Sequence, residues 1–99
     1  MIRGTTPTLE FVLPFDANLL VEAWVTVAQE GEVVVDKPLS ECECVENRLS
    51  VKLTQEDTLK LQGNVMADIQ IRAKTVDGET IASDVIRELT GRILKDGVI

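Results

Sequence analysis

The chain of 99 residues contains no histidine and no tyrosine, and Phe11, Phe15 and Trp24 are its only aromatic residues. Histidine is the commonest general base, so its absence excludes most sites for proton transfer and hydrolysis. The serines have no evident basic partner, and the six glycines match no phosphate-binding pattern. The sequence therefore predicts a protein that is not an enzyme and that binds no cofactor.

Basic residues are also few, because ten lysines and arginines stand against 17 acidic residues and the formal net charge is -7. The basic residues are scattered, which argues against nucleic acid as a partner, since its phosphates would be repelled. No apolar run has the length of a signal peptide or of a bilayer span. We therefore expect no membrane association and no secretion by a signal peptide, with the cytoplasm as the default location.

Only two cysteines are present, Cys42 and Cys44, within the stretch 41-ECECVENRLSVKL-53. A zinc site commonly needs four cysteine or histidine ligands, which this chain does not have. Two positions apart on a strand, the Cα atoms lie roughly 6.5–7 Å apart, at the limit of disulfide geometry. We expect free thiols that serve as small apolar side chains in a reducing compartment, with a metal or redox role as the alternative.

The feature that the sequence does have is alternation of apolar and polar residues with a period of two. It predicts strands over 8–13, 21–29, 33–37, 41–45, 48–54, 65–74 and 79–89. The expected inward-facing residues are Leu9, Phe11, Leu13, Val21, Ala23, Val25, Val27, Leu49, Val51, Leu53, Val65, Ala67, Ile69, Ile71 and Ala73.

Turn residues separate these strands. The stretch 29-QEGE-32 predicts a hairpin with Gly31 as its permissive residue, and 46-EN-47 predicts a tight break. Asp77 and Gly78 predict a two-residue hairpin turn in which both residues adopt positive φ. A calcium site around Asp77 and Glu79 is an alternative use of the same residues.

Two irregularities are expected in the second half of the chain. The stretch 54-TQED-57 predicts a short helix whose first turn is capped reciprocally by Thr54 and Asp57. The apolar residues of 79–89 change face partway along, which predicts a β-bulge near Ser83 and Asp84.

About seven or eight short strands with one short helix predict an all-β fold, an antiparallel β-sandwich of Ig-like type. A small β-barrel is the alternative. A single domain covers residues 1–99, in which 1–6 form a possible N-terminal arm and 90–99 a possible C-terminal arm or last strand.

Trp24 departs from the alternation, because it lies on the face of Glu22 and Thr26 that should contact water. It either covers an edge of the core or anchors a partner, as exposed tryptophan often does at interfaces. Val12, Val34 and Met66 also fall on outward faces. Together with Trp24 they would form an apolar patch suited to self-association.

Three stretches carry a family resemblance: 2-IRGTTPTLEFVLPFD-16, 51-VKLTQEDTLKL-61 and 69-IQIRAKTVDGETIASDVI-86. They resemble small proteins encoded in the phage and prophage structural-gene regions of Gram-positive bacteria, and they are similar to the N-terminal β-sandwich domain of phage baseplate upper proteins. The resemblance implies an antiparallel β fold and a role in the virion or its assembly, and it implies no catalytic residues.

The resemblance leads to the hypothesis of a non-enzymatic virion structural or assembly protein, associated with the tail or baseplate and acting through protein–protein contacts. Its expected partners are copies of itself, giving a homo-oligomer, or other virion proteins. Its expected locations are the host cytoplasm during assembly and then the virion. The candidate interface residues are Ile2, Arg3, Trp24, Met66, Ile93, Leu94 and Ile99. The alternative function is a carbohydrate- or ligand-binding module in which Trp24 is a stacking platform.

Overall fold

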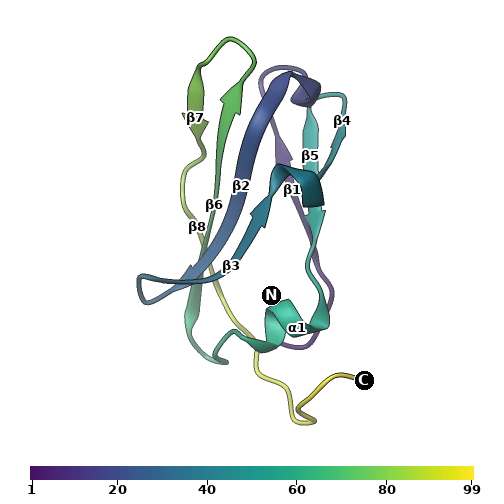
Figure 1. Ribbon diagram of the computed structural model, residues 1–99. Coiled ribbons are helices and arrows are strands. Elements are labelled where there is room, and N and C mark those ends of the chain that lie inside the picture. The colour runs from purple at the N-terminus through teal and green to yellow at the C-terminus, as the bar shows by residue number, and fades with distance from the viewer.

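The computed structural model describes residues 1–99 and contains two antiparallel sheets that face each other (Figure 1). The smaller sheet has the order β1-β5-β4, and the larger has the order β3-β2-β6, with β7 and β8 both paired to β6. This arrangement confirms the predicted all-β sandwich of eight strands with one short α-helix. The strands are β1 (Thr8–Val12), β2 (Leu20–Gln29), β3 (Glu32–Pro38), β4 (Glu43–Val45), β5 (Arg48–Lys52), β6 (Met66–Thr75), β7 (Thr80–Ala82) and β8 (Ile86–Leu89).

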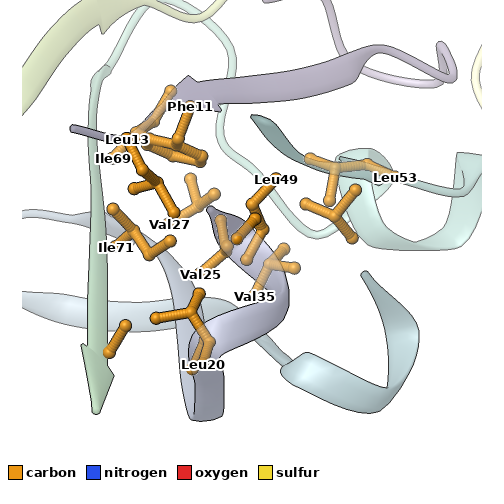
Figure 2. Close-up of a cluster of buried hydrophobic side chains, with 14 of the residues drawn as sticks. Phe11, Leu13, Leu20, Val25, Val27, Val35, Leu49, Leu53, Ile69 and Ile71 are labelled. Carbon is orange, nitrogen blue, oxygen red and sulfur yellow. The ribbon is translucent and has the colours of Figure 1, made fainter. Parts of the chain in front are cut away.

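A single cluster of 16 buried apolar side chains fills the space between the sheets. Val25 and Val27 of β2 and Leu49 of β5 are completely buried, and Figure 2 shows them among the other core side chains. Each buried aliphatic side chain contributes roughly 1.5–3 kcal/mol relative to an exposed one, so this cluster is the main source of stability. The alternation read from the sequence identifies most of its members.

The start of β2 is an exception to the alternation. Val21 was predicted to face inward, but its side chain is exposed and Leu20 is buried instead. The register between β2 and β6 shifts between Leu20 and Glu22. One additional residue therefore lies in β2 at this point, and it turns Val21 outward.

One of the two hairpin turns agrees with the prediction, and the other differs from it. At the β2–β3 turn, Glu30 has φ 52° and Gly31 has φ 79°, as in a two-residue turn with both central residues left-handed. At the β6–β7 turn only Gly78 has positive φ, and its N–H donates to the Thr75 carbonyl over 2.9 Å. The prediction that Asp77 also adopts positive φ is wrong, because this hairpin has a longer loop.

The predicted bulge in the return strand is present. β7 pairs Arg72 with Ala82, whereas β8 pairs Ile69 with Ile86, so the return strand contains one residue more than β6 between these pairs. Ser83 lies at the interruption and stays attached to β6, because its N–H donates to the Ile71 carbonyl over 3.0 Å.

The helix α1 (Gln55–Leu59) closes the lower end of the sandwich in Figure 1. Its predicted capping box is confirmed: Thr54 Oγ1 accepts from the Asp57 N–H over 3.1 Å, and Asp57 accepts from the Thr54 N–H over 2.9 Å. Asp57, Thr58 and Leu61 are the buried residues of this region. The remaining helical elements are short 3₁₀ turns, Ala17–Leu19 and Leu39–Glu41.

Both terminal segments lie near α1. Residues 1–6 do not form a free arm, because Ile2 pairs in parallel with Gly91 and Arg3 Nε donates to the Leu61 carbonyl over 2.6 Å. Residues 90–99 form no strand, although Thr90 is completely buried. Beyond Gly91 the chain extends below the sandwich in Figure 1.

Candidate functional site

The outer face of the larger sheet has a groove of about 420 Å³ centred on Trp24. Trp24 of β2 lies directly opposite Arg72 of β6, and Glu22 lies opposite Lys74. Because directly opposed residues of antiparallel strands have Cβ atoms about 4.5–5.5 Å apart, these side chains are close neighbours. The groove is lined by Glu22, Trp24, Thr26, Asp36, Arg72, Ala73, Lys74 and Thr80.

Trp24 is held in place on this face by its polar edge. Its indole N–H donates to Glu22 Oε2 over 3.0 Å, and 40% of the residue surface is exposed. Beside Trp24, Thr26 Oγ1 of β2 donates to Asp36 Oδ1 of β3 over 2.6 Å. Trp24 therefore does not belong to the core, and its ring is available as a contact surface.

Arg72 and Lys74 are the two cations of the groove. The ion pairs of the molecule involve Met1, Arg3, Lys37, Arg48 and Arg87, and neither Arg72 nor Lys74 takes part in one. Two positions apart on β6, the two side chains project from the same face. The sequence shows this spacing, but it does not show that β2 pairs with β6 and so brings Trp24 beside them.

The end of the same face next to α1 is apolar. Met66 of β6 lies opposite Leu89 of β8. Ile2 pairs with Gly91, which follows Leu89 by two residues. Their exposed fractions are 38% for Met66, 58% for Leu89 and 51% for Ile2. We call Ile2, Met66 and Leu89 the terminal apolar patch.

The structure separates the residues that were predicted to form one apolar patch. Met66 is six residues from Arg72 on β6, so it lies roughly 20 Å from Trp24 along the strands. Val12 is on the outer face of the smaller sheet, and Val34 packs partly against the core. The prediction that these residues gather around Trp24 is therefore wrong.

The other candidate interface residues have different surroundings. Arg3 is mostly covered and also donates to the Leu59 carbonyl over 3.0 Å, so it anchors the N-terminal segment. Ile93 is half-buried close to Gly4. Leu94 and Ile99 are almost fully exposed. Two of the seven candidates, Ile2 and Met66, belong to the terminal apolar patch.

Cys44 lies on β4 of the smaller sheet, and Cys42 lies directly before that strand. Both are free thiols and pack partly against the core, as predicted. Burial raises the pKa of Cys42 to about 11, with the neighbouring Cys44 and Glu41 adding to the effect. Burial also raises the pKa of Cys44. Neither thiol is therefore activated as a nucleophile. Nowhere do three cysteine or carboxylate side chains converge in a way that would hold a metal ion.

None of the helices combines the length and the apolar character that crossing a bilayer requires. No protein family, no curated protein and no solved structure matches this chain.

Proposed function

We propose that this chain is a non-enzymatic structural or assembly protein of a phage or prophage particle, associated with its tail or baseplate. It acts through contacts with its own copies or with other virion proteins, in the host cytoplasm during assembly and then in the virion. The resemblance of three stretches of the sequence to phage structural proteins supports the biological setting. The terminal apolar patch is the structural observation that supports a role in protein contacts.

The patch is suited to an interface because its three side chains are adjacent and exposed. Met66 lies opposite Leu89, and Ile2 pairs with Gly91. One edge of β8 pairs with β6, and the first residues bond to the backbone of the other edge only at Leu89 and Gly91, which leaves residues 86–88 of that edge without a strand partner. An unpaired strand edge offers N–H and C=O groups to an incoming strand, and neighbouring apolar side chains provide selectivity. The combination favours a partner that covers this end of the larger sheet.

The oligomeric state of the purified chain tests this proposal. Size-exclusion chromatography with light scattering should show a mass above that of the monomer and increasing with concentration. Leu89→Glu should lower that mass, because it places a charge in the centre of the patch. Val12→Glu is the matched control, since Val12 is equally apolar and exposed but lies on the smaller sheet.

A wild-type chain that stays monomeric at high concentration, and that binds no protein encoded by neighbouring genes, would contradict the contact role. Neighbouring genes that encode no tail or capsid proteins would contradict the phage setting separately.

The groove at Trp24 favours a second candidate function, the binding of a carbohydrate or another small ligand. An exposed indole with polar residues on both sides is suited to stacking against a ligand ring while hydrogen bonds fix its orientation. A glycan-binding screen of the wild-type chain and of Trp24→Ala tests this candidate, which requires binding that depends on Trp24.

A further inference from the structure

We infer that the groove at Trp24 binds an acidic saccharide, with a sugar ring on the indole and the sugar carboxylate on Arg72 and Lys74. This inference rests on the second candidate function and is independent of the assembly role. In this arrangement β2 provides the stacking surface and β6 provides the positive charges.

The register of the strands places the indole that would stack on the sugar ring next to the cations that would bind the carboxylate. Arg72 lies directly opposite Trp24, and Lys74 follows two positions later on the same face. A ring that covers the indole therefore has one edge next to the guanidinium group. A carboxylate on that edge can accept two parallel hydrogen bonds from an arginine, which is the geometry that favours arginine for carboxylate recognition.

The groove is lined by two carboxylates and two cations, and they differ in how far they are hydrogen-bonded. Glu22 already accepts from the Trp24 indole, and Asp36 accepts from the Thr26 hydroxyl. Arg72 and Lys74 have no ion-pair partner, although the chain carries a net charge of -7. The groove therefore offers two unpaired cations to a ligand, which favours an anion.

The lining favours a saccharide over an apolar peptide side chain. Only two of its eight residues are hydrophobic, Trp24 and Ala73, so the groove has no apolar pocket beyond the indole. A sugar ring has an apolar face for the indole and hydroxyl groups at its edge. Those hydroxyls can donate to the remaining lone pairs of Glu22 and Asp36.

The fluorescence of the protein provides a direct test. Trp24 is the only tryptophan and the chain has no tyrosine, so its emission reports on this groove alone. The probe is tetragalacturonate, and the matched neutral probe is the same tetrasaccharide with its carboxyl groups reduced to alcohols. We expect a saturable change in emission with the acidic probe and an affinity at least tenfold lower for the neutral one.

Substitutions of the two cations test whether they bind the carboxylates of the probe. Arg72→Gln should weaken binding of tetragalacturonate at least tenfold, and Lys74→Gln should weaken it several-fold. Lys52→Gln on β5 of the smaller sheet is the matched control and should leave the affinity unchanged, because Lys52 is also exposed but does not line the groove. Circular dichroism should be the same for all variants, since each changed side chain lies on the surface.

The outcomes separate the possible failures. Equal affinity for the acidic and the neutral probe, or full affinity in Arg72→Gln, would overturn the assignment to an acidic ligand but leave carbohydrate binding in place. No change in emission, together with no shift of the Trp24 indole N–H signal in NMR spectra, would overturn both. Neither result affects the measurement of oligomeric state.

Discussion

Lys37 Nζ lies 2.9 Å from Asp57 Oδ2, and the pair connects β3 of the larger sheet to the helix that follows β5 of the smaller sheet. Both side chains are largely covered, with 16% and 11% of their surfaces exposed. Lys37 also lies 3.4 Å from Glu41. The end of the sandwich next to α1 is therefore held by a charged contact as well as by the core.

The first prediction concerns this ion pair. Asp57→Asn keeps an oxygen for the Thr54 cap but removes the charge, so it leaves the Lys37 ammonium without its main partner. We expect a loss of about 2–4 kcal/mol in the free energy of unfolding, measured with urea. Glu10→Gln is the control, because the Glu10–Arg48 pair is exposed and its loss should cost less than about 0.5 kcal/mol. Equal stability of wild type and Asp57→Asn would contradict the prediction.

The second prediction is the pH dependence of the same contact. Burial alone would raise the pKa of Asp57, but hydrogen bonds from Thr54 and Lys37 outweigh it and hold the pKa below the usual 3.8. The hydrogen bond to Asp57 is the main cause that raises the pKa of Lys37 above the usual 10.5, against the opposing effect of burial.

The directions of these two pKa shifts define the pH range over which the ion pair contributes its full stability. Stability from Asp57 is fully present above its unfolded-state pKa and is lost as the pH falls through the lower folded-state pKa. Stability from Lys37 is fully present below its unfolded-state pKa and is lost as the pH rises through the higher folded-state pKa. The difference in stability between wild type and Asp57→Asn should thus be constant from about pH 5 to 9 and shrink outside that range. A difference that persists unchanged at pH 2 would disprove this assignment.

The third prediction concerns the thiols. Because the pKa of Cys42 is about 11 rather than the usual 9.0, its thiolate is scarce at pH 8. Iodoacetamide should modify Cys42 in the folded chain roughly a hundredfold more slowly than in urea, since the thiolate is the reacting form. Peptide mass spectrometry distinguishes Cys42 from Cys44, which should also be slowed. Equal rates in the folded and unfolded chain would show that Cys42 is accessible and that its pKa is not raised.

The fourth prediction concerns the β2–β3 turn. Glu30 adopts φ 52°, a conformation that costs energy for most residues and is tolerated best by glycine and asparagine. Glu30→Asn creates an Asn-Gly turn and should raise the free energy of unfolding by about 0.5–1 kcal/mol. Asp77→Asn is the control and should bring no gain, because Asp77 does not have positive φ. Thermal unfolding of both variants gives the comparison, and a gain at Asp77 alone would refute it.

The fifth prediction concerns a buried amide. Gln29 Nε2 donates to the Gln62 carbonyl over 2.9 Å and to Thr90 Oγ1 over 3.2 Å, and Gln29 Oε1 accepts from the Gln62 N–H over 2.8 Å. Gln29→Met leaves these groups unpaired and should cost about 1–3 kcal/mol in urea unfolding. Gln70→Met is the matched control, because Gln70 lies on the outer face with a single bond to Ser83, and it should cost less. Equal losses in the free energy of unfolding at both positions would mean that the buried hydrogen bonds of Gln29 contribute no more than the exposed one of Gln70.

The sequence predicts those parts of the fold that depend on neighbouring residues. Apolar residues at every second position identify Phe11, Ile69 and Ile71 as buried, and the Thr54 cap follows from residues three positions apart. The register shift that turns Val21 outward involves β6, more than forty residues away in the chain, so no local pattern indicates it.

The candidate site was predictable only in part for the same reason. The outward position of Trp24 follows from alternation along β2. Its position opposite Arg72 depends on which strands pair and in which register, and a single sequence does not specify this. The buried position of Gln29 is opposite to what its polarity suggests, because its partners come from two distant segments of the chain, one with Gln62 and Val65 and one with Thr90.

The parallel pairing of Ile2 with Gly91 also affects how copies of the molecule meet. The Met1 ammonium contacts Glu88, and the Gly91 N–H donates to the Met1 carbonyl over 2.8 Å, so the first residues shield part of the β8 edge. Unshielded edges of this kind are where sheets extend into fibrils. Detachment of residues 1–3 would therefore uncover the rest of the β8 edge, where a strand of another copy could add to the sheet.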